Sequence, residues 1–285
     1  APGSFTNLTQ RLDFSSDTCS LPGNNLPSTY KDTRTINTAN YSFVVGNTGP
    51  APTYDPHSTI KRLDFSTETI AVPGTNTVAK KYFATVTDGS TGYFGGGYVP
   101  TPTPPGINSN FHTIDLLTES VSSSPITFFD GLEEHSSTSG GASSGRSNGY
   151  KDVGYFKGGY DGGNSSYVKR MDFTSDTSST PSMRISHATT GMNGVANNNF
   201  GYAMGGFHGQ GTPPPGTGDN IESRLHRIDF ATENLTVLPA TPEAHTNYTT
   251  LWSVDDMYGW KAGDQFSSPP SPVGTRSDIR RLDYS

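Results

Sequence analysis

Cysteine is almost absent from this sequence. Cys19 is the only one, which excludes a disulfide within the chain and a metal site built from several cysteines, and leaves the redox compartment open. Long apolar runs are missing too: none approaches the roughly 18 residues of a membrane helix, and no charged-then-apolar leader precedes Ala1. We therefore expect no membrane insertion. Because no initiator methionine begins the chain, we expect a processed product or a fragment.

Positive charge is scarce as well. The chain has 19 Lys and Arg against 26 Asp and Glu, a net charge of -7, and no basic run, so neither nucleic acid nor an anionic membrane is an expected partner. Hydrophobic residues make up only 31%, whereas the 33 glycines and 21 prolines are many. The aromatic residues, 11% of the chain, recur at regular intervals, and this favours many short strands joined by Gly/Pro turns.

One short strand pattern recurs along the whole chain at intervals of 51 to 57 residues. Side chains two apart in a strand share a face, so its Arg and Asp lie on one side and its apolar residues on the other. A repeat of this period indicates a solenoid, a propeller or an array. The six copies are Gln10-Arg11-Leu12-Asp13-Phe14, Lys61-Arg62-Leu63-Asp64-Phe65, His112-Thr113-Ile114-Asp115-Leu116, Lys169-Arg170-Met171-Asp172-Phe173, His226-Arg227-Ile228-Asp229-Phe230 and Arg280-Arg281-Leu282-Asp283-Tyr284.

A glycine-rich strand precedes each of the later five copies. We call it strand B and the Arg-Leu-Asp-Phe strand C; a polar strand A precedes B, and a strand D follows C after a Ser/Thr/acidic turn. The strongest B copies end in the pairs Gly96-Gly97, Gly158-Gly159 and Gly205-Gly206. In the weaker copies Asn47 and Asp264 replace the second glycine, and since Asn and Asp best tolerate positive φ, we expect a left-handed backbone at that position.

Four antiparallel strands in a unit of about 50 residues are typical of a propeller blade. We expect residues 1–285 to form a single all-β domain, a β-propeller of four-stranded antiparallel blades. The six C strands against five B strands favour five blades closed by N- and C-terminal strands, with six as the alternative; the surplus C strand then packs outside the ring or pairs with a neighbouring molecule. The expected blade units are 34–74, 82–125, 135–182, 187–239, and 245–285 completed by 8–22.

These motifs resemble the kelch-type propeller repeat, although the usual Trp of strand D is absent. The combination of Gly-Tyr-Phe-Gly-Gly-Gly at 92–97 with the Arg-Leu-Asp-Phe strand is more similar to kelch-like repeats in structural proteins of tailed phages that infect cyanobacteria and other marine bacteria. This resemblance implies a non-enzymatic virion protein on the capsid or tail, used for decoration, assembly or host attachment. The implied partners are other virion proteins or copies of itself, with a host-surface glycan as a further option, and the implied location is the virion or the extracellular space. The alternatives are a secreted or cell-surface carbohydrate-binding propeller and a propeller enzyme.

The repeated carboxylates are not expected to be catalytic. A catalytic pair needs two carboxylates in different environments at one place, whereas these stand one per blade. We expect each to pair with the Arg two positions earlier or with backbone of the next blade, and Asp115, which lacks that Arg, to be satisfied otherwise. The sequence contains no nucleophile, metalloprotease or phosphate-binding motif, and we predict no cofactor. The six are Asp13, Asp64, Asp115, Asp172, Asp229 and Asp283.

Two further sets of residues are candidates for binding. His135, His187 and His245 fall near the starts of three A strands, where imidazoles at a channel mouth are either metal ligands or ordinary wet polar groups. The long Pro-rich B–C loops lie on one face of a propeller, and Tyr54, Tyr98, Tyr160 and Phe207 stand at or near their roots. These aromatic rings suit either contact with a ligand such as a sugar or packing between blades.

Overall fold

The computed structural model is built from strands and turns and has no helix among the residues it describes. In that part of the chain nothing helical is long and apolar enough to cross a bilayer. The all-β prediction is therefore confirmed. The described residues are 7, 9–13, 16, 18–27, 33–48, 56–74, 76–99, 106–127, 136–139, 152–159, 165–208, 224–239, 250–253, 258–268 and 271–283.

Four sheets each contain four antiparallel strands that follow one another in chain order. Sheet 1 comprises β3 (Arg34–Asn37), β4 (Tyr41–Val45), β7 (Lys61–Asp64) and β8 (Ile70–Ala71). Sheet 2 comprises β9 (Ala84–Thr87), β10 (Thr91–Gly95), β13 (Asn110–Asp115) and β14 (Val121–Thr127). Sheet 3 comprises β15 (Ser136–Ser139), β16 (Val153–Lys157), β17 (Val168–Asp172) and β18 (Thr177–Ser179). Sheet 4 comprises β20 (Asn193–Ala196), β21 (Phe200–Met204), β23 (Leu225–Asp229) and β24 (Leu235–Leu238).

The two ends of the chain form smaller units. Sheet 5 has three strands, β25 (Thr250–Ser253), β26 (Tyr258–Ser268) and β27 (Ser271–Asp283), and the N-terminal hairpin pairs β1 (Arg11–Asp13) with β2 (Thr18–Ser20). Three short ladders follow the B strands: β5 (Asn47–Thr48) with β6 (Pro56–His57), β11 (Tyr98–Val99) with β12 (Gly106–Ile107), and β19 (Thr189–Thr190) with β22 (Phe207–His208).

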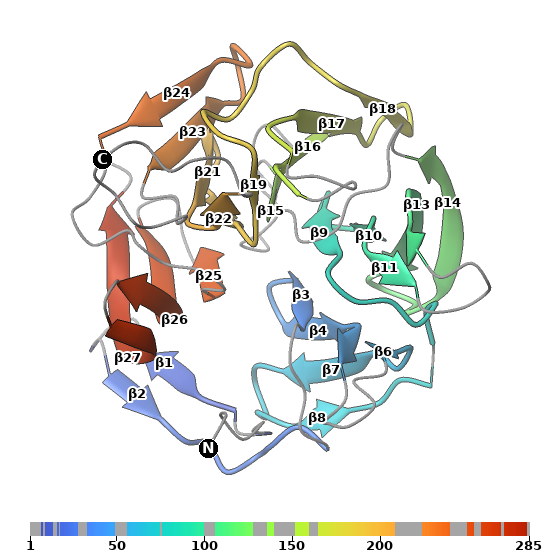
Figure 1. Cartoon of the computed structure of the whole chain (residues 1–285). Coiled ribbons are helices and arrows are strands. Elements are labelled where there is room, and N and C mark those ends of the chain that lie inside the picture. The colour runs from blue at the N-terminus through green and yellow to red at the C-terminus, as the bar shows by residue number, and fades with distance from the viewer. Residues whose placement is uncertain are drawn as a thin grey trace.

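The sheets stand in a ring, as in a propeller (Figure 1). The A strands β3, β9, β15 and β25 lie nearest the centre, and the D strands β8, β14, β18 and β24 lie at the rim. Successive A strands contact each other from β3 to β9, β15, β20 and β25. Among the described strands no contact of similar extent joins β25 back to β3. In the same view the N-terminal hairpin occupies the interval between sheet 5 and sheet 1.

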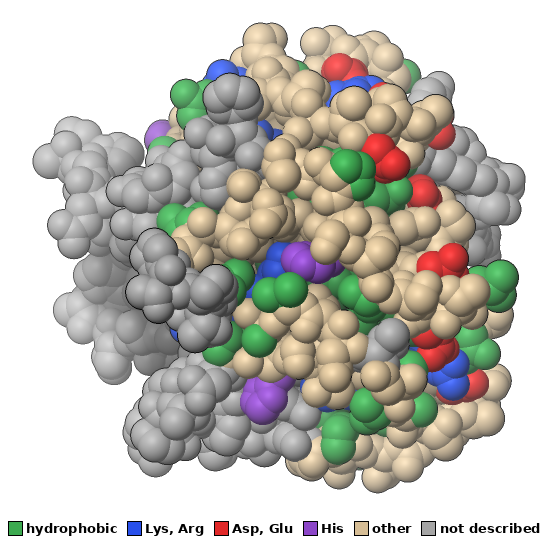
Figure 2. Space-filling view, turned by 90° about the vertical axis from the view of Figure 1, so that its right-hand side faces the viewer, with side chains coloured by type: hydrophobic (Ala, Val, Ile, Leu, Met, Phe, Trp, Pro, Cys, Tyr) green, Lys and Arg blue, Asp and Glu red, His purple; other side chains and the backbone are tan. Residues whose placement is uncertain are grey.

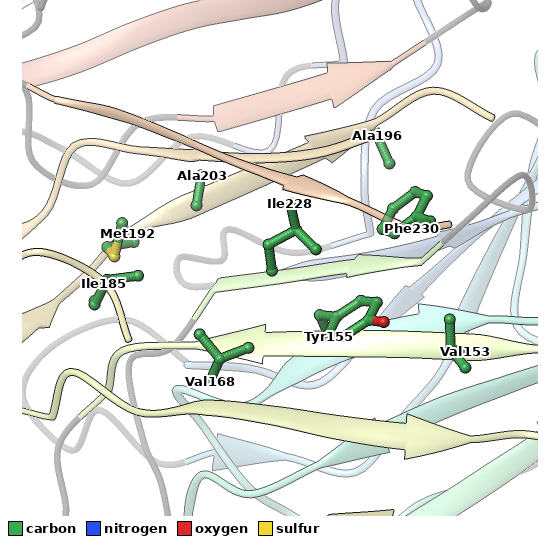
Figure 3. Close-up of a cluster of buried hydrophobic side chains, with 9 residues drawn as sticks. All are labelled: Val153, Tyr155, Val168, Ile185, Met192, Ala196, Ala203, Ile228 and Phe230. Carbon is green, nitrogen blue, oxygen red and sulfur yellow. The ribbon is translucent and has the colours of Figure 1, made fainter. Parts of the chain in front are cut away.

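Hydrophobic clusters hold consecutive sheets face to face. The cluster between sheets 3 and 4 contains Tyr155 and Val168 from one sheet and Ile228 and Phe230 from the other (Figure 3). Similar clusters lie between sheets 1 and 2 and between sheets 2 and 3, and Leu282 of β27 packs on the next cluster, in sheet 4. Because every second residue of a strand faces the same neighbour, the alternating pattern of strand C produces this stacking.

The second glycine of a pair such as Gly96-Gly97 is required for two reasons, its backbone conformation and the space around it. Gly97 has φ 86° and an added Cβ would lie 2.6 Å from the Lys81 carbonyl oxygen, so the second glycine is required both for its backbone and for space. The prediction of a left-handed second position is wrong for Asn47, since Asn47 begins the extended strand β5 and the positive φ of 54° belongs to Gly46. Asp264 likewise lies inside β26, next to an irregularity in its pairing with β27.

One predicted inner strand is displaced. The sequence predicts that strand A of the unit 187–239 starts near His187, but β20 begins at Asn193. Gly191 has φ 65°, which ends the extended backbone there, and Thr189 and Thr190 pair with β22 instead. His187 therefore precedes this small ladder and is not part of the inner strand.

Candidate functional site

The repeated carboxylates cap their own turns. Asp64 Oδ1 accepts hydrogen bonds from Ser66 N at 2.8 Å, Ser66 Oγ at 2.7 Å and Thr67 N at 3.1 Å, and these bonds lower the pKa of Asp64. The Thr118 and Leu117 amides lower the pKa of Asp115 in the same way. Asp172 and Asp229 also accept two backbone amides each, and Asp13 accepts that of Ser16. These carboxylates are bound to local backbone groups and do not converge on one place.

An acidic residue with positive φ follows in each turn. Glu68, Glu119, Asp176 and Glu233 have φ between 50° and 60°, a backbone that non-glycine residues seldom adopt. The side chains of Glu68, Glu119 and Glu233 reach the preceding unit of the ring, where each binds an arginine.

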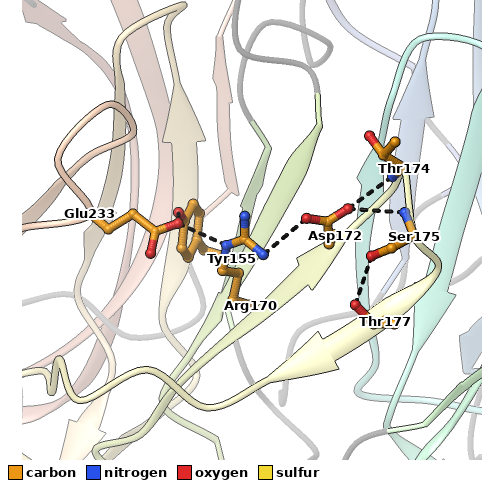
Figure 4. A network of polar contacts seen from close by, with 7 residues as sticks. All are labelled: Tyr155, Arg170, Asp172, Thr174, Ser175, Thr177 and Glu233. Atoms are coloured by element: carbon orange, nitrogen blue, oxygen red, sulfur yellow. Dashed lines mark hydrogen bonds and ion pairs between the residues drawn. The ribbon is translucent and has the colours of Figure 1, made fainter.

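The arginines of strand C reach these acids across the sheet interface. Arg62 binds Glu119 of sheet 2, and Arg11 of β1 binds Glu68 of sheet 1. Arg170 Nε donates to Glu233 Oε1 of sheet 4 at 2.8 Å (Figure 4). The expected pairing with the Asp two positions later is present for Arg170 and Asp172, at 3.2 Å, whereas Arg11 and Arg62 bind the acid of the following sheet. We call the contact between the arginine of a strand C and the acidic turn residue of the following sheet the Arg–acid latch.

A tyrosine completes the latch between sheets 3 and 4. Tyr155 Oη donates to Glu233 Oε1 at 2.9 Å (Figure 4). The Tyr155 ring stacks on Phe230 with centroids 5.7 Å apart (Figure 3). Burial, together with Glu233, raises the pKa of Tyr155, so its hydroxyl stays protonated and able to donate. In sheet 2, where Thr113 replaces the arginine, Thr113 Oγ1 instead lies 2.8 Å from Ser122 Oγ of its own sheet.

A buried basic position was missed by the sequence reasoning. The residue immediately before the Arg or Thr of strand C is Lys61, His112, Lys169 or His226 in sheets 1 to 4, and all but the half-buried His112 are fully buried. A signal was present, because this position is basic or an amide in all six copies. Burial together with Lys80 lowers the pKa of His112 to about 4.

Two further lysines of the interior have strongly perturbed amines. Burial lowers the pKa of Lys80 to about 8, and its Nζ donates to the Asn110 carbonyl oxygen at 3.3 Å. Lys157 ends strand β16 with no exposed surface, and burial lowers its pKa to about 7. Among the described residues Lys157 Nζ has no hydrogen-bond partner.

Of the three histidine candidates, only His187 is in the described part. It contacts Arg224, while the neighbouring Ser186 donates its backbone N–H to His226 Nε2 at 3.1 Å and has its Oγ 2.9 Å from the same nitrogen. His135 and His245 lie outside the described residues. Within the described part no group of three or more potential ligands could hold a metal ion.

The aromatic candidates are only partly described. The Tyr98 ring lies 5.2 Å from Lys81 Nζ, and Tyr98 exchanges two backbone hydrogen bonds with Lys81, so at least part of this ring is used in packing. Phe207 lies in β22, of whose side chains nothing is described, and Tyr54 and Tyr160 lie outside the described residues. The side of the molecule seen in Figure 2 is mostly backbone and uncharged side chains with scattered apolar ones, and acidic side chains recur along one edge.

No known family model matches the chain, and no curated protein is found to be similar to it.

Proposed function

We propose that this chain is a non-enzymatic structural protein, a rigid propeller that presents its long B–C loops to a partner in an assembly. The observation that carries the proposal is the Arg–acid latch, which recurs between the N-terminal hairpin and sheet 1, between sheets 1 and 2, and between sheets 3 and 4, and adds polar contacts to the hydrophobic stacking. A rigid ring loses little further conformational entropy when its loops bind. The repeated carboxylates, bound to turn amides, contribute to the frame and not to a reaction centre.

The loops themselves support a display role. Each of the B–C connections in sheets 1 and 2 holds an extra two-stranded ladder, β5 with β6 and β11 with β12. The sequence of the connection between β11 and β12 also contains prolines at 100, 102, 104 and 105, and proline reduces the backbone freedom of a chain. Loops with such a composition are suited to binding a protein or a glycan on one face of the ring.

We place the protein on a tailed-phage virion, on the capsid or tail, as the resemblance of its repeats implies. Antibodies against the chain, applied to purified phage particles and imaged by electron microscopy, should label one fixed position on the particle. Recovery of the protein only in cell fractions free of particles would exclude this placement.

The loop face is tested separately. Replacing residues 101–105 with a Gly/Ser segment of equal length should weaken attachment to the particle or the host surface and leave thermal unfolding unchanged. Leu117→Ser, in an exposed C–D turn, is the matched control and should bind normally. Equal loss of binding in both variants would contradict display by the B–C loops.

We further propose that the ring has six blade positions, the alternative to the five expected. Arg11 contacts Glu68 as Arg62 contacts Glu119, so the N-terminal hairpin stands before sheet 1 as sheet 1 stands before sheet 2. This supports β1 and β2 as strands C and D of a blade of their own. The closure of a five-bladed ring by β2 as the fourth strand of sheet 5 stays an untested prediction.

A further inference from the structure

The tyrosine just before the inner strand of sheet 2 has a strained backbone. Tyr82 has a φ of 61°, and the other non-glycine residues with positive φ in the described part are the four acidic turn residues. A bulky aromatic residue seldom adopts this conformation, because its side chain then crowds the backbone. Strain of this kind persists where the side chain has a role, so it indicates a function for the ring of Tyr82.

Sheet 4 shows that the fold does not require a tyrosine at this position. In sheets 2 and 4 the second glycine of strand B lies against the residue that starts the approach to the inner strand: an added Cβ would come within 2.6 Å of the Lys81 and Thr190 carbonyl oxygens, respectively. Lys81 and Thr190 are therefore equivalent. The next residue is Tyr82 in sheet 2 but Gly191, with φ 65°, in sheet 4. Sheet 2 thus holds a tyrosine in a backbone for which sheet 4 uses glycine.

The strained tyrosine places its ring beside a lysine amine that also contacts a second tyrosine. Lys81 Nζ lies 5.0 Å from the centre of the Tyr82 ring and 5.2 Å from the centre of the Tyr98 ring. Lys81 and Tyr98 exchange two backbone hydrogen bonds, of 2.8 and 3.1 Å, which hold the two residues side by side. All three residues are half-buried, so part of each stays accessible to solvent. We call Lys81, Tyr82 and Tyr98 the Tyr–Lys clamp.

The amine of the clamp has no counter-charge in the described part of the chain. Lys81 forms no ion pair there, and its Nζ contacts the two rings. A cation beside aromatic rings is attracted by them but keeps its charge. The neighbouring Lys80 differs, since its side chain is fully buried and its Nζ donates to the Asn110 carbonyl oxygen at 3.3 Å. The clamp therefore offers one positive charge between two amphipathic rings.

We propose that the Tyr–Lys clamp binds an acidic saccharide, a pyranose ring that carries a carboxylate. The carboxylate pairs with the Lys81 amine, and the apolar face of the sugar packs on the accessible parts of the Tyr82 and Tyr98 rings. The clamp stands where strand B of sheet 2 ends and its long connection to strand C begins, since Tyr98 is the first residue of β11. The inference rests on the display role proposed above for its setting, because it names a ligand for the same face of the ring, and it is independent of the location on a virion.

The composition of the clamp favours a sugar over an acidic protein segment. A single amine matches the one carboxylate of a uronate unit, whereas a run of acidic side chains would be repelled by a chain whose own net charge is -7. A second tyrosine–cation contact provides a contrast. The Arg184 guanidinium lies 4.3 Å from the centre of the Tyr167 ring, but it also donates to the Pro181 and Met183 carbonyl oxygens. The cation over Tyr167 is thus already hydrogen-bonded, and this contact serves as the control.

Isothermal titration calorimetry on the full chain tests the proposal, with mannuronate, glucuronate and galacturonate tetrasaccharides as probes. At least one should bind saturably, and the matching mannose, glucose or galactose tetrasaccharide should bind about tenfold more weakly, because it lacks the carboxylate. Lys81→Met should remove this preference for the acidic probe. Absence of binding by all three acidic probes would overturn the proposal, and so would equal binding of a glutamate tetrapeptide.

Tyr82→Gly separates binding from folding. Glycine adopts the φ of 61° without strain, so the urea midpoint of the variant should change little, while its affinity for the acidic probe should fall about tenfold. Tyr82→Phe, which keeps the ring, should bind the probe like the parent chain. Tyr167→Ala is the matched control at the other tyrosine–cation contact and should also bind normally. Parent-like affinity of Tyr82→Gly, or equal weakening by Tyr167→Ala, would show that the clamp is not the binding site.

A failure of the clamp is distinguishable from a failure of loop display. The variant at 101–105 keeps all three clamp residues and should bind the acidic probe normally. If that variant loses attachment while no acidic tetrasaccharide binds the parent chain, the clamp is wrong and loop display stands. If probe binding depends on Tyr82 and Lys81 while the variant at 101–105 attaches normally, display by that loop is wrong and the clamp stands.

Discussion

At the scale of single residues, the interior of the protein contains several buried lysines. Lys61, Lys80, Lys157 and Lys169 are all buried, and an amine transferred from water into an apolar interior loses its hydration. The protein compensates in part through carbonyl partners, as Lys61 does with the Thr59 carbonyl oxygen at 3.2 Å. Lys157 is the extreme case, since its amine has no hydrogen-bond partner among the described residues.

Lys157→Met should therefore stabilise the protein. The pKa of Lys157 is lowered to about 7 in the fold from 10.5, so between these values the unfolded chain binds more protons and the stability of the parent rises with pH. The variant lacks this dependence. We expect it to be more stable by about 1–3 kcal/mol near pH 7, an advantage that shrinks toward pH 10. Urea unfolding at pH 7 and pH 9.5 measures both quantities.

The control is Lys81→Met, at a half-buried lysine whose amine lies over the rings of Tyr82 and Tyr98. Lys81→Met should not show a gain in stability that becomes smaller as the pH rises from 7 to 9.5. An advantage of Lys157→Met that stayed constant from pH 7 to pH 9.5 would show that the amine of Lys157 does not carry the effect.

At the scale of elements, the latch joins three C strands, β1, β7 and β17, to the C–D turn of a neighbouring sheet. In the contact between sheets 3 and 4, the Arg170 and Glu233 side chains are 25% and 41% exposed, so solvent screens the ion pair and its contribution is moderate. The added bonds of Tyr155 and Asp172 hold both groups in one geometry. This favours a contribution at the upper end of the range for partly exposed pairs.

A double-mutant cycle on Arg170→Ala and Glu233→Gln should give a coupling free energy of about 0.5–1.5 kcal/mol, from urea unfolding of the four proteins. Raising NaCl to about 0.5 M should reduce it. The control cycle combines Arg184→Ala with Glu233→Gln. The Arg184 guanidinium donates to the Pro181 and Met183 carbonyl oxygens, so this cycle should give a coupling free energy near zero. Equal coupling in the two cycles would mean that the latch is not a specific contact.

The latch also shows where sequence reasoning stopped. The Ser/Thr/acidic turn after strand C was predictable because Asp64 and its amide donors lie within three residues of one another. The partner of Arg62 was not, since Glu119 lies 57 residues away and meets it only when two sheets stack. The prediction of a left-handed backbone at Asn47 was wrong for a similar reason, because pairing with β6 sets the backbone of Asn47 and its own preference for positive φ does not.

At the scale of the whole molecule, the period of the repeat predicted the ring of four-stranded sheets, but it did not settle the closure. Every repeat carries a variant of the same strand C pattern, so the sequence alone cannot tell whether the N-terminal copy serves sheet 5 or a blade of its own. The contacts of the hairpin bear on this choice: Arg11 and Asn24 both bind Glu68 of sheet 1. In the described part, β27 has β26 as its only partner strand.

Deleting residues 1–27 should distinguish the two arrangements. If the hairpin belongs to its own blade, the truncated chain remains folded and β27 keeps its hydrogen-exchange protection at Arg281–Asp283. Faster hydrogen exchange then appears around Glu68 and β7, because Glu68 loses its contacts with Arg11 and Asn24. If β2 is the fourth strand of sheet 5, the protection at Arg281–Asp283 is lost instead, because those amides and carbonyls then lose their outer partner. Arg11→Ala in the intact chain, which removes the latch and leaves both strands, should reproduce only the change around Glu68. Loss of protection at β27 together with an unchanged β7 would therefore establish the five-bladed closure and exclude the six-position ring.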